Sequence, residues 1–316
     1  MTILFSAKVS DKHQQALQEN YPNQLFIFTE SMEQAEAHLG QASILVTYGE
    51  DLNDDNLAKA TNLNWIMVLS AGVERLPFKQ IAERNILVTN SRGIHKIQMA
   101  EYTISMLLQV YRQEKHFIES EKHSKWDKSV RPNEIFGRTL VVLGTGAIGQ
   151  EIARIAKAFQ MKTIGVSRSG RPVEYFDEVH TMEELNKKLP EADFLVSVLP
   201  STYETRYLLK EEHFIRMKDS AVFVNIGRGD LVDSNVLLYA IQEKQIAHAI
   251  LDVFEQEPLP ADSPFWKESN ITVTPHISGS SPNYMSRALD IFQDNLDKFQ
   301  KGETDYQNIV DPKRGY

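Results

Sequence analysis

Apolar and polar positions alternate in blocks along the first 95 residues of the chain. Five short apolar runs, each bounded by polar residues, predict β-strands at residues 3–7, 25–28, 44–47, 65–69 and 87–89. Polar stretches with helical spacing, such as residues 11–20 and 32–39, separate most of these runs. Because strands that alternate with helices form parallel sheets covered on both faces, the pattern predicts a small α/β domain.

Longer amphipathic segments follow this region and close the chain. Residues 96–120 carry an apolar stripe that predicts one long helix, suited to link two domains and to contact a second subunit. Residues 122–133 are charged and irregular, with Trp126 as their one large apolar anchor. Residues 283–301 predict a final amphipathic helix, which we expect to pack back on the first domain.

Between these segments the alternation of strands and helices starts again. Apolar runs predict strands at residues 139–143, 162–166, 193–198, 221–226, 249–253 and 271–274. The first of them ends in a glycine-rich turn, and a helical pattern follows the turn. The residues of this turn are Gly144, Thr145, Gly146, Ala147, Ile148 and Gly149.

A strand, a G-x-G-x-x-G turn and a helix in this order are typical of a dinucleotide-binding unit. Gly144 permits the tight turn, Gly146 lets a pyrophosphate approach the backbone, and Gly149 lets helix and strand pack closely. The amino terminus of the helix then offers free N–H groups to the phosphates. We therefore expect an α/β protein. A Rossmann-type, doubly wound parallel sheet would form a dinucleotide-binding domain at residues 97–281. A smaller, discontinuous, flavodoxin-like substrate domain would comprise residues 1–96 and 282–316.

Composition and charge narrow the class of protein. The 316 residues carry a net charge of −9, which argues against general binding of nucleic acid or anionic membranes. There is no cysteine, so disulfides, thiolate nucleophiles and zinc–thiolate sites are excluded, and we expect no metal site. No apolar run reaches the ~18 residues that span a bilayer, and the first residues do not resemble a signal peptide. We expect a cytoplasmic protein.

Three polar residues that follow predicted strands could carry chemistry. Arg228, Glu257 and His276 each lie in a loop after a strand of the second domain. Taken singly, each would more often be an ordinary surface residue. Together they would form a catalytic group, in which Arg228 binds an anion, Glu257 orients the histidine and His276 acts as the acid. Histidine is the natural proton donor for an alkoxide formed by hydride transfer, a carboxylate can hold its other ring nitrogen, and arginine can grip a carboxylate in two places.

On these motifs the sequence resembles the D-isomer-specific 2-hydroxyacid dehydrogenase family over essentially its whole length. The resemblance rests on the glycine turn, Leu199-Pro200 with Thr205, the run 225–229, Asp252 with the run 257–259, and the run 274–276. It implies that Arg228, Glu257 and His276 are the catalytic residues, with His276 as the proton donor in reduction. Members with appended regulatory domains are longer, so the resemblance implies no such domain here.

The resemblance also assigns binding residues. It implies that the backbone of Ser70, Ala71 and Gly72 binds the substrate carboxylate, and it places Tyr48 in the first substrate loop, where a structural tyrosine is at least as good an interpretation. Beyond the glycine turn, the residues expected to contact the cofactor are Ser167, Arg168, Ser169, Leu199, Pro200, Thr205, Ile226, Gly227, Asp252, Ser278 and Gly279.

The end of the second predicted strand of this domain bears on which cofactor is used. A site that prefers NAD would place Asp or Glu there to bind the adenosine ribose, whereas this chain has Ser167-Arg168-Ser169, with Arg171 nearby. The arginine side chain and the serine hydroxyls would bind a 2′-phosphate, so we expect NADP(H) to be favoured. The alternative is that these are solvated loop residues and that NAD(H) is used as well.

The sequence therefore predicts an oxidoreductase that transfers a hydride between NAD(P)H and a small 2-keto acid, most similar to glyoxylate/hydroxypyruvate reductases, and a homodimer. Within the same class, a short 3-phosphoglycerate dehydrogenase or a broad 2-ketoacid reductase of the D-lactate type stays open. From another class, an NAD(H)-binding corepressor or redox sensor stays open, and a reductase of unrelated chemistry on the same fold is a third alternative.

Overall fold

The computed structural model describes residues 1–312 and divides the chain into two compact units. Unit 1 comprises Met1–Ile94 and Ser281–Tyr316, and unit 2 comprises His95–Ser280. Both divisions lie within two residues of the expected domain boundaries. Residues 313–316, the last four of the expected substrate domain, lie outside the described residues.

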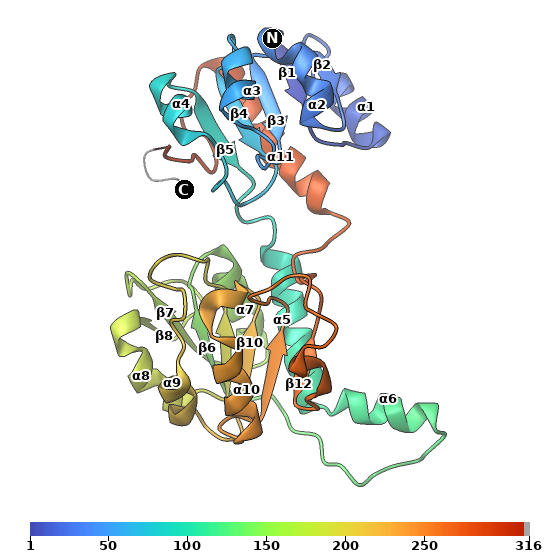
Figure 1. The fold of residues 1–316 in the computed structure, drawn as a ribbon, viewed down its shortest axis with the longest axis vertical. Coiled ribbons are helices and arrows are strands. Elements are labelled where there is room, and N and C mark those ends of the chain that lie inside the picture. The colour runs from blue at the N-terminus through green and yellow to red at the C-terminus, as the bar shows by residue number, and fades with distance from the viewer. Residues whose placement is uncertain (313–316) are drawn as a thin grey trace. The chain divides into compact units, whose positions relative to one another are not determined.

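Unit 1 is built on a five-stranded parallel sheet with the order β2-β1-β3-β4-β5 (Figure 1). Its strands are β1 (Thr2–Phe5), β2 (Leu25–Phe28), β3 (Ile44–Thr47), β4 (Trp65–Val68) and β5 (Leu87–Asn90). Its helices are α1 (Asp11–Asn20), α2 (Met32–Ala35), α3 (Asp54–Lys59), α4 (Phe78–Glu83) and α11 (Tyr284–Lys301). This strand order is that of flavodoxin-like folds, so the expected fold of the smaller domain is confirmed.

Both faces of the unit 1 sheet are buried, because successive side chains of a strand point to opposite faces. In β1, Leu4 belongs to one apolar cluster, whereas Ile3 and Phe5 belong to the other. The second cluster is completed by α11, whose Phe292 is fully buried and stacks on Trp65 with ring centroids 5.5 Å apart. The N-terminal sheet thus obtains one of its covering layers from the end of the chain.

Unit 2 is built on a seven-stranded parallel sheet with the order β12-β11-β10-β9-β6-β7-β8 (Figure 1). Its strands are β6 (Thr139–Leu143), β7 (Lys162–Ser167), β8 (Glu178–Thr181), β9 (Phe194–Ser197), β10 (Val222–Asn225), β11 (His248–Leu251) and β12 (Ile271–Val273). The strand order reverses between β6 and β9, as in the Rossmann fold. The expected doubly wound sheet is confirmed, and ligands of such sheets bind at the carboxyl ends of the strands, at the point of reversal.

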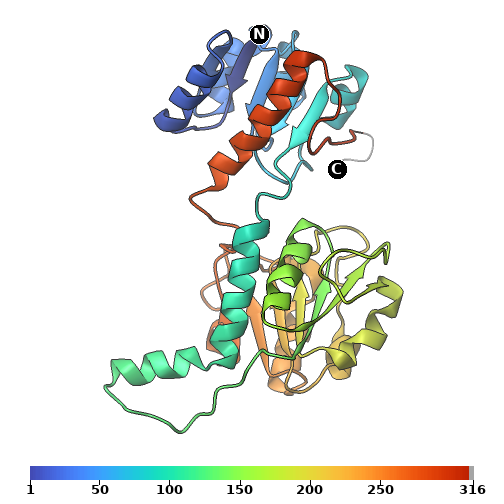
Figure 2. The ribbon, with the colours of Figure 1, turned by 180° about the vertical axis from the view of Figure 1, so that it is seen from behind.

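Helices cover both faces of the unit 2 sheet. They are α5 (Lys96–Tyr111), α6 (Glu114–Lys122), α7 (Ala147–Ala158), α8 (Leu185–Lys188), α9 (Glu211–Arg216) and α10 (Ser234–Gln242). The helix after the glycine turn, α7, packs along α5 (Figure 2). Their shared apolar cluster includes Ile104, Leu107, Ile152 and Ala156. One face of α5 is therefore core, as its apolar stripe predicts.

The prediction of a single helix over residues 96–120 is wrong. Helix α5 ends at Tyr111, Gln113 adopts a left-handed φ of 59°, and α6 begins at Glu114. The apolar stripe stops at Tyr111 and a polar run follows, so nothing holds a continuous helix against the core. None of the nine residues of α6 is buried, and the helix extends away from the rest of unit 2 (Figures 1 and 2).

Two further expectations differ from the structure. Trp126 is 90% exposed and packs into no core of the described residues, so it is not an anchor within this chain. Strand β8 was not expected, because its sequence Glu-Val-His-Thr is mostly polar and its residues are only partly buried at the edge of the sheet. Among residues 1–312, no helix is both long and apolar enough to cross a lipid bilayer.

Candidate active site

The three glycines of the turn between β6 and α7 differ in their steric surroundings. Gly144 has a φ of +103°, a conformation that side chains disfavour. A Cβ on Gly149 would lie 1.9 Å from the carbonyl oxygen of Gly144, so helix and strand are in direct contact there. A Cβ on Gly146 would meet no atom of the described residues within 4 Å. The backbone at Gly146 therefore faces open space, and no side chain caps the amino terminus of α7.

The end of β7 places Ser167, Arg168 and Ser169 beside this turn in the sheet order. The Ser167 hydroxyl is buried and has no hydrogen-bond partner among the described residues. Arg168 is exposed. It lies close enough to Glu204, in the loop after β9, for its charge to affect the pKa of that carboxyl group. The pKa of Glu204 is lowered by its own backbone N–H, by Thr202 and further by Arg168. No acidic residue stands at the end of β7.

The loops after β9 and β10 pack tightly against each other. A Cβ on Gly227 would lie 2.5 Å from the carbonyl oxygen of Leu199, so only glycine allows this approach. Pro200 is tied to Thr205, whose hydroxyl donates to the Pro200 carbonyl at 2.6 Å. Ile226 is buried. These contacts hold the loops after β9 and β10 together at the carboxyl edge of the sheet.

Asp252, at the end of β11, organises the loop that follows β12. Its side chain is fully buried and accepts hydrogen bonds from the Thr274 hydroxyl at 2.6 Å and from the backbone N–H groups of Ile277 and Ser278 at 2.9 Å each. Because the Thr274 hydroxyl donates to Asp252, the Tyr102 hydroxyl, 2.6 Å away, donates to Thr274. The structure gives Asp252 a structural task that the sequence did not predict.

His276 and Glu257 are in direct contact. The Nδ1 of His276 lies 2.7 Å from Oε2 of Glu257, and Oε1 of Glu257 accepts the backbone N–H of Phe254 at 2.9 Å. The carboxylate is thus fixed at both oxygens, and the imidazole carries its Nδ1 proton toward it. Nε2 has no hydrogen-bond partner among the described residues, and the side chain is 49% exposed. His276 has a φ of +52°, in the left-handed region.

Arg228 follows β10, the strand beside β11. Its Nη1 donates to the Gly227 carbonyl at 2.9 Å, and no carboxylate of the described residues forms an ion pair with it. Sheet order places β10, β11 and β12 side by side, so Arg228, Glu257 and His276 follow three consecutive strands at one edge. The structure brings Glu257 and His276 together. The catalytic roles of the three residues stay predictions.

The predicted substrate residues of unit 1 lie after two neighbouring strands, β3 and β4. The Ser70 hydroxyl donates to the Gly72 carbonyl at 2.8 Å and lies 3.2 Å from the Tyr48 carbonyl. The carbonyl of Ala71 accepts the amide of Asn90 at 2.8 Å. Burial raises the pKa of Tyr48. These contacts turn carbonyls inward to side chains of unit 1 and hold the two loops together.

Side chains on one face of α5 were missed by sequence reasoning. Gln98 and His95 contact the Gly279 carbonyl, and Tyr102 contacts Thr274, so all three hold the loop after β12. Their spacing of three and four residues places them on one side of a helix. Polar residues at positions 95, 98 and 102 of an otherwise apolar stripe are the signal that could have found them.

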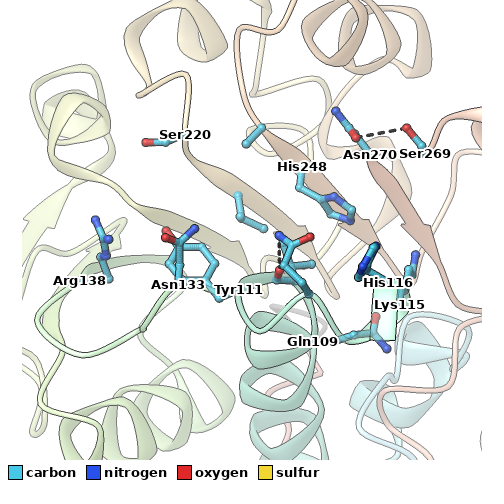
Figure 3. Close-up of a pocket in the computed structure, with 14 residues that line it drawn as sticks. Gln109, Tyr111, Lys115, His116, Asn133, Arg138, Ser220, His248, Ser269 and Asn270 are labelled. Atoms are coloured by element: carbon cyan, nitrogen blue, oxygen red, sulfur yellow. Dashed lines mark hydrogen bonds between the residues drawn. The ribbon is translucent and has the colours of Figure 1, made fainter. Parts of the chain in front are cut away.

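A hollow of about 430 Å³ lies at the amino edge of the unit 2 sheet, opposite the carboxyl edge, where β10, β11 and β12 begin (Figure 3). Figure 3 shows Arg138 at one end of it and Lys115 with His116 at the other. Burial, with a smaller effect of the Lys115 charge, lowers the pKa of His248 in its wall to about 4. None of the predicted site residues lines this hollow.

Among residues 1–312, no group of three or more His, Asp or Glu side chains could hold a metal ion.

Comparison with known proteins gives the family. The model of the D-isomer specific 2-hydroxyacid dehydrogenase NAD binding domain matches residues 104–278. The glyoxylate/hydroxypyruvate reductase B of Yersinia pestis is 30% identical over 98% of this chain and 97% of its own length. The chain is also 33% identical to the D-3-phosphoglycerate dehydrogenase of Methanocaldococcus jannaschii over 84% of its residues, but it spans only 51% of that protein.

Solved structures agree with this result. A D-isomer specific 2-hydroxyacid dehydrogenase family protein from Aeromonas salmonicida has a TM-score of 0.87 and 37% identity, covering 98% of this chain and 99% of its own. The NADPH-dependent glyoxylate/hydroxypyruvate reductase of Sinorhizobium meliloti, solved with NADP and sulfate, has a TM-score of 0.79 and 26% identity, covering 100% and 99%. The chain therefore belongs to the D-isomer specific 2-hydroxyacid dehydrogenases, oxidoreductases that use a nicotinamide cofactor and act on CH–OH groups.

Proposed function

We propose that this 2-hydroxyacid reductase acts on small 2-keto acids of the glyoxylate and hydroxypyruvate class and prefers NADPH. The observation that carries the proposal is the 2.7 Å hydrogen bond between His276 and Glu257. These residues follow β12 and β11, and β11 lies beside β10, the strand that leads to Arg228. An acid held by a carboxylate, together with an arginine that forms no ion pair with a carboxylate of the described residues, suits reduction of a ketone that carries a carboxylate.

Each residue has a separate task in this scheme. A bound nicotinamide cofactor supplies the hydride. Arg228 binds the substrate carboxylate and draws electron density from the neighbouring carbonyl. Glu257 holds Nδ1 of His276, so the ring is oriented and its protonated form is stabilised. Nε2 of His276 then gives its proton to the carbonyl oxygen as the alkoxide forms. In the reverse direction the same nitrogen accepts the hydroxyl proton.

The glycine turn supports binding of the cofactor pyrophosphate. The backbone at Gly146 faces open space, and the uncapped amino terminus of α7 offers N–H groups and the positive end of the helix dipole. Gly144 and Gly149 are required by the turn itself, whereas no atom of residues 1–312 lies within 4 Å of a Cβ at position 146. That difference is what a site for a bound phosphate would produce.

The preference for NADPH is supported by the end of β7. Arg168 is exposed there, and the buried Ser167 hydroxyl has no partner among the described residues. An acidic residue, which would repel a 2′-phosphate, is absent from residues 167–169. Glu204 opposes this assignment to a limited degree, because it lies close enough for the Arg168 charge to lower its pKa.

In unit 1, we propose that the loop of Ser70, Ala71 and Gly72 binds the substrate carboxylate through its backbone N–H groups. The support is that the Ala71 carbonyl is already occupied by Asn90 and the Gly72 carbonyl by Ser70. With the carbonyls turned to these partners, the loop has N–H groups to offer an anion. Tyr48, on the loop beside it, would line the same site.

The test is one matrix of both cofactors against a panel of 2-keto acids. Glyoxylate and hydroxypyruvate with NADPH should give the highest kcat/KM. Faster turnover of 3-phosphohydroxypyruvate would favour a 3-phosphoglycerate dehydrogenase, and faster turnover of pyruvate would favour a D-lactate type. No oxidation of either cofactor with any keto acid, together with measurable cofactor binding, would favour a regulatory sensor over an enzyme.

We also propose a homodimer that forms through α6 and the segment after it. The nine residues of α6 are all unburied, and large apolar side chains are exposed at Phe117, Ile118 and Trp126. Such a surface is typical of a protein contact. Light scattering on the wild type and on Trp126→Ala tests it, since the variant should shift toward the monomer mass. The predicted cytoplasmic location stays a prediction.

A further inference from the structure

Two side chains, one in α5 and one at its N-cap position, converge on one backbone carbonyl in the loop after β12. The amide of Gln98 donates to the Gly279 oxygen at 3.0 Å, and Nδ1 of His95 lies 3.3 Å from the same oxygen. His95 occupies the N-cap position of α5, and Gln98 lies one turn further along the same face. Gly279 follows the proposed proton donor, His276, by three residues.

The helix and the loop fit closely at this point. A Cβ on Gly279 would lie 3.2 Å from Nδ1 and 3.7 Å from Cε1 of His95. The imidazole thus lies against the backbone of Gly279, and a larger residue there would press on the ring. This packing, together with the hydrogen bonds, ties the loop to a helix whose other face is buried in the core of unit 2.

Asp252 fixes the same loop from the strand side. Its carboxylate accepts the N–H groups of Ile277 and Ser278, so three successive residues after His276 are held by side chains. His276 itself has a φ of +52°, a conformation that is unfavourable for a non-glycine residue and persists only where the surroundings impose it. Asp252 holds the near side of the loop, and α5 holds the far side.

His95 is neutral at this site. Burial lowers its pKa, the bond to Gly279 partly opposes this, and the positive charge of Arg228 lowers it further. A neutral ring that donates from Nδ1 to Gly279 adds no charge beside Arg228, which the proposed scheme uses to bind a carboxylate. His95 therefore combines a hydrogen bond to the loop with electrical neutrality.

We propose that His95 and Gln98 are positioning residues, which hold the Gly279 carbonyl and thereby keep His276 against Glu257. The inference rests on the proposed function, in which His276 is the proton donor. Loss of the two donors would free the end of the loop, weaken the contact between His276 and Glu257, and lower the fraction of molecules in which His276 is oriented for proton transfer.

The variants for the test are His95→Leu and Gln98→Leu, with His95→Asn as the conservative variant. Asparagine keeps an N–H donor at the reach of Nδ1 and stays neutral. Ser105→Ala, on an exposed position of α5, is the matched control. Each leucine variant should lower kcat for reduction roughly tenfold, shift its pH profile to lower pH and change the KM for NADPH less than twofold. His95→Asn should restore most of the loss. These sizes correspond to one hydrogen bond of about 1–1.5 kcal/mol.

A second measurement separates this inference from the proposed function. The Nδ1–H resonance of His276, which reports the hydrogen bond to Glu257, is recorded by NMR in wild type, His95→Leu and Gly279→Ala without any substrate, and it should weaken or move upfield in both variants. If wild type reduces no keto acid but the resonance weakens or moves in the variants, the proposed function is wrong and the positioning role stands. If wild type turns over and neither the resonance nor the pH profile of kcat changes in the variants, the positioning role is wrong. A rise in the KM for NADPH with unchanged kcat would also overturn it.

Discussion

Glu257 holds Nδ1 of His276 at 2.7 Å with one carboxylate oxygen, while its other oxygen accepts the backbone N–H of Phe254. The carboxylate therefore cannot rotate away without breaking two hydrogen bonds. This rigidity leaves Nε2 as the nitrogen that meets a substrate.

Replacing Glu257 with Gln should shift the pH profile for reduction to lower pH. The charged carboxylate favours the protonated ring, and reduction needs that proton, so the falling limb of the rate should move down by about one pH unit or more. This corresponds to the loss of a charged hydrogen bond of about 1.5–3 kcal/mol. Measurement of kcat against pH for wild type and variant checks it. An unmoved profile would mean that Glu257 does not act on His276.

Replacing His276 with Asn should lower kcat for reduction by roughly 10²–10⁴-fold, the usual contribution of a general acid. Asparagine tolerates the left-handed conformation at this position, so the fold should be kept. The melting temperature and the dissociation constant for NADPH serve as controls and should be unchanged. If the variant kept its kcat, another group would have to be the proton donor.

Replacing Arg168 with Ala should raise the KM for NADPH roughly 10–100-fold and leave the KM for NADH nearly unchanged, because only NADPH carries the 2′-phosphate. The matched control is Arg171→Ala, four residues beyond Ser167 in the same loop. Equal effects of the two changes on NADPH would point to the general charge of the loop instead of a contact at Arg168.

Two glycines of the turn should respond differently to alanine. Gly149→Ala should lower the stability by about 1–3 kcal/mol, because its Cβ would overlap the Gly144 carbonyl. Gly146→Ala should melt at the wild-type temperature, since its Cβ meets no atom, yet bind NADPH roughly tenfold or more weakly. Thermal melts and cofactor titration separate these outcomes. Wild-type cofactor binding by Gly146→Ala would contradict the placement of the pyrophosphate.

His248 should make stability depend on pH in mildly acidic solution. Its pKa is about 4 in the folded protein, against 6.5 for the ordinary side chain, so between these values only the unfolded chain takes up the proton. Stability should therefore fall as the pH drops from 6.5 to 4, by on the order of 2 kcal/mol given its partial exposure. His248→Gln should flatten this slope, whereas His123→Gln, on the exposed surface of the protein, should not. Equal slopes in all three proteins would disprove the assignment.

Most strands of the two sheets could be predicted from the sequence, because the buried strands are short apolar runs between polar residues. The edge strand β8 could not be predicted, since a partly exposed strand needs no such apolar run. The break between α5 and α6 depends on where the core ends, which periodicity does not reveal. The motifs also pointed to Glu257 and His276, which the structure finds in contact. The tasks of Asp252, His95 and Gln98 could not be predicted, because they depend on contacts between residues far apart in the sequence.

The covering of the N-terminal sheet by α11 has a consequence for synthesis of the chain. Residues 95–280 leave the ribosome before Phe292 and Leu296, so unit 2 can complete its core while one face of the first sheet still lacks its covering helix. The strands that are translated first are thus among the last to have both faces buried. During that interval the apolar face that includes Trp65 is exposed and can associate with other chains.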